Sequence, residues 1–238
     1  MLLNEWIMRN VGQTLADFVH GAGLDGLVLE VNDAFSLGSD YTDLRPYTFE
    51  MVNQIGQTVR KYKLLAILSI APAIGLKADM RENVSKLYGR KEADGLLASF
   101  DYLQLWTYSS GEKNRRYLNS DYFFEQNAEF FKNSSQVMFG LNFYGFEYNL
   151  NDFQTKEEPP FKVTTRDRYL SLLKENDSVF TFNYNTMEHE LYSERNNTFI
   201  RYPSLTSLEY RLRLIREKKM PVAIWDYGQG LDYFTNLL

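Results

Sequence analysis

The stretch Gly26-Leu-Val-Leu-Glu-Val-Asn32 decides the fold class, because it is short and mostly apolar. It follows Gly21-Ala-Gly23, which ends the preceding helix. Such a run is typical of a buried β-strand. Before it, apolar residues recur at helical spacing over residues 6–19, and after it a helix is expected over residues 46–62. The chain therefore opens with a helix, followed by a strand and a second helix.

The same alternation of strand and helix continues to the end of the chain. Further strands are expected at residues 64–71, 102–108, 137–144 and 222–227, and further helices at residues 79–97 (in two pieces split near Gly89), 121–132, 165–175, 204–219 and after residue 227. Two aromatic-rich stretches, residues 179–184 and 199–202, are typical of hairpin strands.

Repeated strand–helix–strand units predict an α/β fold in which helices cover a parallel sheet. A doubly wound sheet and a (β/α)8 barrel both fit this order. The sequence has no G-x-G-x-x-G or Walker motif that would favour a nucleotide-binding sheet. The five strands found are fewer than a complete barrel needs, so the residues alone leave closure of the sheet open.

Composition excludes several classes of protein and site. The net charge of −5 argues against a nucleic-acid partner. The absence of cysteine excludes thiolate metal sites and a cysteine nucleophile, and the two histidines, His20 and His189, leave little for a metal site or catalytic triad. We therefore expect no metal and no cofactor. No apolar run approaches the length of a membrane span, and the first ten residues lack the unbroken apolar core of a signal peptide.

Basic residues gather near the end of the helix expected at residues 204–219. Glu209 and Glu217 dilute this cluster, which predicts a solvated helix face. The cluster consists of Arg211, Arg213, Arg216, Lys218 and Lys219. His20 and His189 are predicted to be ordinary surface or turn residues.

Asp25-Gly-Leu-Val-Leu-Glu-Val-Asn32 resembles the fourth-strand motif of glycoside hydrolase family 18, the chitinases, written D-G-x-D-x-D-x-E. Three later segments resemble the same family in the same order. Leu105-Trp-Thr-Tyr108 resembles strand six and Gly140-Leu-Asn-Phe-Tyr-Gly145 resembles strand seven. The last resemblance is to strand eight in one branch of the family, and residues 202–205 together with residues 223–234 carry it.

This resemblance implies an α/β fold of the chitinase-type TIM (β/α)8 barrel. Residues 1–238 would supply strands four to eight, so strands one to three and any secretion signal would be missing from this chain. A small α+β insertion is expected at residues 149–203, before the last helix–strand pair. The resemblance also implies a secreted or lysosomal protein, and four glycosylation sequons, at Asn83, Asn133, Asn176 and Asn196, give slight support.

The catalytic motif is degenerate in this copy. In the family the last Glu protonates the glycosidic oxygen, while the preceding Asp orients the substrate's own acetamide. After Asp25, the inward positions here hold Val28, Glu30 and Asn32. A carboxamide cannot donate a titratable proton, so the general-acid contribution, typically ~10²–10⁴-fold, is expected to be lost. Ser109 also replaces the Asp that follows the strand-six tyrosine, so the resemblance predicts a protein that does not hydrolyse chitin.

Two alternatives for Glu30 stay open. An apolar barrel interior would raise its pKa as a general acid requires, which would make the protein an active glycosidase. Otherwise Glu30 is a buried carboxylate hydrogen-bonded to Tyr108 or Tyr144. A third interpretation of the whole groove is a scaffold that binds another protein and no sugar.

The aromatic residues of the family site are better retained than its acids. Trp225, Tyr144 and Tyr108 match the family pattern, and Trp106 takes a further site position. Pyranose rings stack on flat aromatic faces, although the same rings could simply fill the barrel. The resemblance predicts an oligosaccharide or glycan ligand, with a protein receptor as a further possible partner. The expected substrate-binding residues are Glu30, Asn32, Trp106, Tyr108, Asn142, Tyr144, Trp225 and Asp226.

Overall fold

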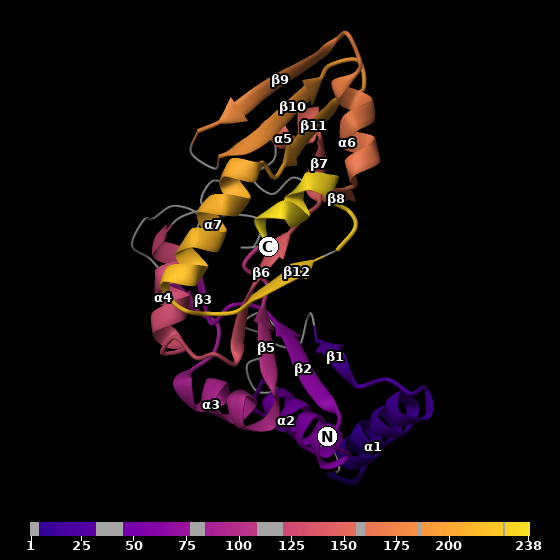
Figure 1. Ribbon diagram of the computed structural model, residues 1–238, viewed down its shortest axis with the longest axis vertical. Helices are drawn as coiled ribbons and strands as arrows, with labels where there is room; N and C mark the ends of the chain where they lie inside the picture. The colour runs from indigo at the N-terminus through magenta and orange to yellow at the C-terminus, as the bar shows by residue number, and fades with distance from the viewer. Residues whose placement is uncertain are drawn as a thin grey trace.

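Two five-stranded sheets organise the protein (Figure 1). The computed structural model describes residues 5–31, 45–76, 84–108, 121–155, 160–184, 187–225 and 227–238. The first sheet has the strand order β1-β2-β5-β6-β12, and the second has the order β8-β7-β11-β10-β9. In Figure 1 the second sheet lies at the upper end of the molecule, beyond the tips of β6 and β12.

The first sheet is entirely parallel and curls into half of a barrel. Every neighbouring pair in it is parallel, which confirms the α/β fold with a parallel sheet. Its strands are β1 (Gly26–Glu30), β2 (Leu65–Ile70), β5 (Tyr102–Leu105), β6 (Val137–Asn142) and β12 (Val222–Trp225). Within the described part of the chain, β1 pairs only with β2 and β12 only with β6, so the sheet has two edges there.

Helices cover one face of this sheet, and the main core lies between the helices and the sheet. The helices are α1 (Glu5–Gly21), α2 (Arg45–Lys61), α3 (Arg90–Ser99), α4 (Asp121–Phe130) and α7 (Leu205–Glu217). Alternate strand residues, such as Leu27 and Leu29 on β1, pack into this core. The other parity faces away from the helices, and on the outermost strand its residues Val28 and Glu30 are exposed. We call this second face the inner face.

The second sheet is antiparallel and contains more strands than the two expected hairpin stretches. Its strands are β7 (Gly145–Asn149), β8 (Phe161–Thr164), β9 (Ser178–Asn183), β10 (Glu188–Ser193) and β11 (Thr198–Tyr202). Helix α5 (Leu150–Thr155) follows β7, and α6 (Arg166–Leu173) packs on the face that carries Leu191 and Ile200. Strands β7, β8 and β10 each carry charged residues, which hid their strand character from a pattern search.

The prediction of a two-piece helix over residues 79–97 is wrong in its first piece. Residues Val84–Lys86 form strand β4, antiparallel to β3 (Ile74–Leu76), and residues 77–83 lie outside the described part of the chain. Asn83 and Ser85 flank Val84, and such side chains compete with helical hydrogen bonds, so the local sequence does not sustain a helix. The helix α3 begins only after Gly89, which is its N-cap residue. The expected helix at the end of the chain is a 3₁₀-helix, Asp232–Leu237.

Helix α7 joins the two sheets. Its start is capped by a reciprocal pair, because Ser204 accepts a hydrogen bond from the Ser207 backbone and the Ser207 hydroxyl bonds the Ser204 backbone. Near this start Leu208 is buried in the core of the second sheet, and near the other end Ile215 is buried in the core of the half-barrel. One helix therefore contributes to both cores.

His189 lies on β10 rather than in a turn, so the prediction for this residue is wrong. Its Nδ1 is 2.9 Å from the hydroxyl of Tyr169 on α6, and the ring of Phe180 meets it edge-on with centroids 5.0 Å apart. Burial lowers the pKa of His189 below its ordinary value, with a smaller opposing effect of Glu188. His20, in contrast, is exposed in the last turn of α1, as expected.

Replacing Gly26 with alanine should weaken the pairing of β1 with β2. A Cβ at this position would lie 2.2 Å from the carbonyl oxygen of Leu65, and neither backbone can yield without breaking the ladder. We expect Gly26→Ala to lower the free energy of unfolding by about 1–3 kcal/mol, as overpacking does. Urea denaturation measures this change.

Gly21→Ala is the matched control, because nothing lies within 4 Å of the added methyl group. Its free energy of unfolding should stay within about 0.5 kcal/mol of the unchanged protein. Equal stability of the Gly26 and Gly21 variants would contradict the close approach of β1 and β2.

His189 should make stability depend on pH. Because its pKa is lower in the folded protein than in the unfolded chain, the unfolded chain binds the proton first as pH falls. The free energy of unfolding should therefore decrease as pH falls through about 6.5, the ordinary pKa of histidine, and below it, and His189→Asn should remove that part of the decrease. An unchanged slope in His189→Asn would contradict the assignment.

Candidate functional site

The carboxyl ends of the parallel strands form one end of the inner face, where parallel α/β sheets carry their sites. Strand register brings residues from different strands side by side there. Glu30 pairs with Ser69, and Ser69 pairs with Gln104. On the other side of the sheet, Asn142 pairs with Trp225. These residues share the inner face, so side chains from all parts of the half-barrel converge on it.

Three of the predicted aromatic residues form one cluster at this end. Tyr108 stacks on Trp225, with ring centroids 6.4 Å apart and an angle of 12° between the planes. Tyr144 meets Tyr108 edge-on at 6.4 Å and 72°. Tyr108 and Tyr144 are buried, whereas Trp225 is half-buried. The indole is therefore oriented by its neighbour while part of its surface remains open to solvent.

Gly140 makes room for this cluster. A Cβ on Gly140 would lie 2.6 Å from Cε1 of Tyr108 and 2.6 Å from the carbonyl oxygen of Leu105. Only glycine therefore allows the Tyr108 ring to lie against β6. The neighbouring Thr107 hydroxyl donates a hydrogen bond to the carbonyl oxygen of Gly140 at 2.6 Å, which ties the end of β5 to β6.

The Asn142 side chain makes buried hydrogen bonds to other parts of the protein. Its Nδ2 donates a hydrogen bond to the carbonyl oxygen of Tyr144 at 2.8 Å, and its Oδ1 accepts one from Nη1 of Arg211 at 3.3 Å. Arg211 in turn donates from Nη2 to Oε1 of Glu188 at 2.5 Å. The three residues are all buried, at 3% exposure or less. This chain of contacts connects β10, α7 and β6 to the backbone that carries the Tyr144 ring.

The prediction that Arg211 lies on a solvated helix face is wrong. Arg211 is 2% exposed, because it occupies the same face of α7 as Leu208 and Ile215, at helical spacing. That spacing is the sequence signal which could have identified it. Arg213 and Arg216 are exposed, as the prediction for the cluster requires.

Trp106 follows β5 directly, and β2 holds its indole in place. Its Nε1 donates to the hydroxyl of Ser69 at 2.6 Å, and its backbone N–H donates to the carbonyl oxygen of Ile70 at 3.0 Å. Ser69 is fully buried, whereas Trp106 is half-buried. Trp106 is therefore held at the carboxyl ends of β2 and β5 with part of its ring accessible.

Glu30 is exposed on the inner face at the end of β1. The interpretation of Glu30 as a buried carboxylate is therefore wrong. Val28, two residues earlier on the same face, is 53% exposed, and Asp25 is exposed before the strand. Asn32, Ser109 and Asp226 lie outside the described residues, so the predictions for these three positions stay predictions.

Sequence reasoning missed the buried polar groups that support the site. Besides Arg211 and Glu188, these are Ser69 and Gln104, at 0% and 5% exposure on the inner face. Alternation along β2 and β5 places both on the same face as Glu30, and that parity could have indicated them. Among the described residues, no group of three or more His, Asp or Glu side chains could hold a metal ion. In the same part of the chain, no helix is long and apolar enough to cross a membrane.

Solved structures with the same arrangement include two chitinases and a glycoside hydrolase family 18 N-acetylglucosaminidase. A chitinase from Chromobacterium violaceum superposes with a TM-score of 0.68 at 13% identity, over 98% of this chain and 74% of that one. A family 18 N-acetylglucosaminidase from Paenibacillus barengoltzii gives a TM-score of 0.68 at 13% identity, over 99% and 76%. A class V chitinase mutant from Cycas revoluta in complex with (GlcNAc)3 gives a TM-score of 0.66 at 12% identity, over 97% and 72%.

These similarities establish a chitinase-like fold. No protein-family model matches the sequence. At 12–13% identity the similarity concerns the fold alone, and the chemistry of the site has to be argued from its own residues.

Removing one partner of the buried Arg211–Glu188 pair should destabilise the protein strongly. Arg211→Met leaves the Glu188 carboxylate buried without its cation, which costs about 3–5 kcal/mol in comparable buried pairs. We expect Arg211→Met and Glu188→Gln each to lower the free energy of unfolding, and the double variant to lose less than the sum of the two. Urea denaturation of the four proteins gives the coupling.

Arg213→Met is the control on the same helix, because the Arg213 side chain is 62% exposed and its 4.0 Å pair with Glu217 lies at the surface. It should change the free energy of unfolding by less than about 0.5 kcal/mol. Additive effects of the Arg211 and Glu188 substitutions would show that the two side chains do not depend on each other.

Proposed function

We propose that this protein binds a chito-oligosaccharide or related glycan at the carboxyl ends of its parallel strands and has no hydrolase activity. The observation that carries the proposal is the aromatic cluster on the inner face. Tyr108 stacks on Trp225, and Tyr144 meets Tyr108 edge-on, while the indole of Trp225 keeps accessible surface. Such a surface suits a sugar ring, whose C–H groups pack on an aromatic face.

The fold supports this ligand class. One protein of the same fold, the plant class V chitinase mutant, is described in complex with (GlcNAc)3. Trp106 adds a second half-buried indole at the same end of the sheet, and Ser69 holds it by a hydrogen bond. In this proposal the sugar lies between the two indoles, along the inner face.

Loss of hydrolysis is proposed from the residues of the motif at the end of β1. Asn32 occupies the position of the general acid, Val28 replaces the first inward Asp, and Ser109 replaces a further Asp. An amide has no proton acidic enough to give to a leaving alkoxide, so the step that cleaves the glycosidic bond lacks its acid.

A second candidate is an active glycosidase in which Glu30 is the acid. Because Glu30 is exposed, the apolar surroundings that this alternative assumed are not found around it. What favours the candidate is that a substrate on the inner face could reach the carboxyl group. The third candidate, a scaffold that binds a protein receptor and no sugar, would use the same face.

The finer assignment of the chain belongs to the same proposal. Residues 202–205 and 223–234 resemble one branch of family 18, chitinase domain-containing protein 1, and we propose that the chain represents strands four to eight of such a barrel with an insertion at residues 149–203. A secreted or lysosomal glycoprotein is the corresponding setting. Asn133 and Asn176 are exposed, whereas the side-chain nitrogen of Asn196 donates to Glu175 and Ser193.

Trp225→Ala should weaken sugar binding, because it removes the open aromatic surface of the site. We expect chitotriose affinity to fall on the order of tenfold or more, since one ring contact contributes about 1 kcal/mol or more. Isothermal titration calorimetry with the full chain measures the change without depending on tryptophan fluorescence. Tyr184→Ala, which removes an aromatic side chain 86% exposed after β9, should leave the affinity unchanged.

Three outcomes would overturn parts of the proposal. No heat of binding at millimolar chitotriose would favour the protein scaffold. Equal losses in the Trp225 and Tyr184 variants would place binding elsewhere. Turnover of a chromogenic chito-oligosaccharide that disappears in Glu30→Gln would show that the protein is an enzyme and that Asn32 does not prevent hydrolysis.

A further inference from the structure

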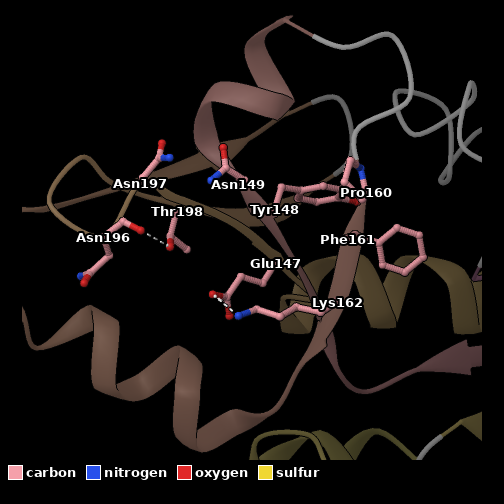
Figure 2. Close-up of a pocket in the computed structure, with 9 residues that line it drawn as sticks. All are labelled: Glu147, Tyr148, Asn149, Pro160, Phe161, Lys162, Asn196, Asn197 and Thr198. Atoms are coloured by element: carbon pink, nitrogen blue, oxygen red, sulfur yellow. Dashed lines mark hydrogen bonds and ion pairs between the residues drawn. The ribbon is translucent and has the colours of Figure 1, made fainter.

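A cleft of about 390 Å³ opens on the second sheet, away from the aromatic cluster (Figure 2). It lies where the end of β7, the start of β8 and the turn between β10 and β11 meet. The residues that line it are Glu147, Tyr148, Asn149, Pro160, Phe161, Lys162, Asn196, Asn197 and Thr198. A volume of this size is sufficient for a small ligand.

This cleft differs from the proposed sugar site in both position and residues. Glu147 and Lys162 are paired across β7 and β8, so their side chains share one face of the sheet. The alternate residues Phe146 and Tyr148 share the opposite face and belong to the apolar cluster against which Trp225 packs. The polar side chains of the cleft therefore point away from the Trp225 side of the sheet.

Two carboxamides offer free donors at one end of the cleft. Oδ1 of Asn149 accepts the backbone N–H of Asp152 at 3.1 Å, and Oδ1 of Asn197 accepts the backbone N–H of Asn151 at 3.3 Å. Because each oxygen faces a backbone donor, the orientation of each amide is determined. Within the described part of the chain, neither Nδ2 has a hydrogen-bond acceptor. Figure 2 shows both amide groups at the same end of the cleft, above Thr198.

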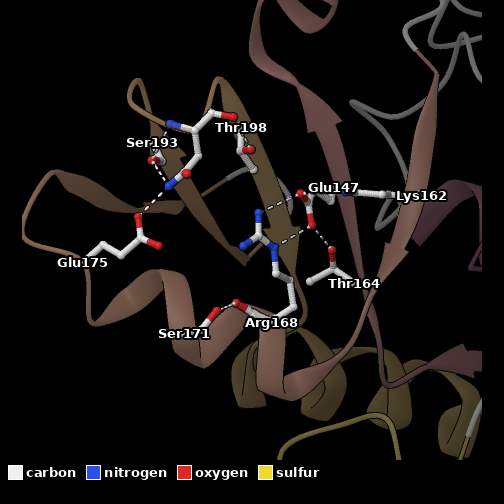
Figure 3. Close-up of polar contacts among 9 residues, drawn as sticks. Glu147, Lys162, Thr164, Arg168, Ser171, Glu175, Ser193 and Thr198 are labelled. Atoms are coloured by element: carbon white, nitrogen blue, oxygen red, sulfur yellow. Dashed lines mark hydrogen bonds and ion pairs between the residues drawn. The ribbon is translucent and has the colours of Figure 1, made fainter.

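At the other end a buried carboxylate holds Lys162 in place (Figure 3). Glu147 is 5% exposed and accepts hydrogen bonds from Thr164 at 2.9 Å, from Arg168 at 3.1 and 3.3 Å, and from the Lys162 ammonium at 3.1 Å. Burial alone would raise the pKa of Glu147, but the bonds from Arg168, Thr164 and Lys162 together hold it below its ordinary value. The carboxylate is therefore charged and fully engaged, while the Lys162 side chain remains 70% exposed and keeps N–H groups for a ligand.

The cleft thus offers hydrogen-bond donors and no free carboxylate among its described residues. The donors are the two amide groups and the ammonium of Lys162. The hydroxyl of Thr198 donates to the carbonyl oxygen of Asn196 at 2.9 Å and is not a donor for a ligand. The ligand of the cleft must present several oxygen acceptors, so that the two amide groups and the ammonium can all donate to it. Hydroxyl and acetamido oxygens meet this requirement, and the exposed Pro160 supplies apolar surface at the rim.

From this geometry we infer a second saccharide-binding site, which takes an N-acetylated sugar unit through Asn149, Asn197 and Lys162. The ligand class is that of the proposed function, but the residues are separate, so each site can be tested without the other. A glycan chain long enough to reach both faces would be bound at two points.

Side-chain amide NMR signals provide the test, with N,N′-diacetylchitobiose as the probe and the full chain as the sample. Assigned by their disappearance in single variants, the Asn149 and Asn197 amide signals should shift in a saturable way on titration. The shifts should persist in Trp225→Ala, which removes the aromatic surface of the other site. The double variant Asn149→Asp/Asn197→Asp keeps both Oδ acceptors for the α5 backbone but removes both donors, so the cleft should lose at least about tenfold in affinity.

Asn133→Asp/Asn176→Asp is the matched control, because it adds the same two charges at exposed positions outside the cleft. It should leave the titration unchanged, and an equal loss in this control would overturn the inference. Absence of shifts at millimolar disaccharide in the unchanged protein would also overturn it. If the cleft signals shift while calorimetry detects no effect of Trp225→Ala, the proposed function fails and this inference stands. If Trp225→Ala weakens chitotriose binding in calorimetry while the cleft signals do not shift, the inference fails and the proposed function stands.

Discussion

The ion pair between Arg211 and Glu188 holds the two sheets of this protein together, since it is buried where α7, β10 and β6 meet. Taking both charges out of water costs free energy, and the 2.5 Å contact recovers it only because the geometry is constrained on all sides. A pair of apolar residues could fill the same space, but it would not specify one orientation. The pair therefore specifies how the two sheets are oriented. Arg211 also donates to Asn142, so the position of the second sheet and the end of β6 are determined together.

The aromatic cluster depends on this ion pair indirectly, through Asn142. Asn142 donates to the backbone of Tyr144, and Tyr144 meets Tyr108, which stacks on Trp225. Gly140 provides the space in which the Tyr108 ring lies. A substitution in the buried pair would thus disturb the rings through the backbone, without any contact between the substituted residue and a ligand.

Much of the half-barrel could be predicted from the sequence, because apolar runs and helical spacing are strong where a strand is covered on its helix side. Leu27 and Leu29 belong to such a run, and the five parallel strands follow the predicted order. The second sheet was harder, because Glu188 and Glu190 interrupt the apolar pattern of β10 and only tertiary partners explain their burial. The family motifs indicated the aromatic residues, and the structure brings Tyr108, Tyr144 and Trp225 together. Arg211 was missed since composition alone describes a basic cluster as solvated, whereas its helical position decides its burial.

The half-barrel also has a chemical consequence along its outermost strand. Within the described residues β1 bonds only to β2, so its other side presents a row of backbone N–H and C=O groups. Val28 on this strand is 53% exposed. Such a margin is a template for strand addition, by an extended segment of the same polypeptide or of another molecule. What covers it in solution decides whether the protein remains dispersed or assembles edge to edge.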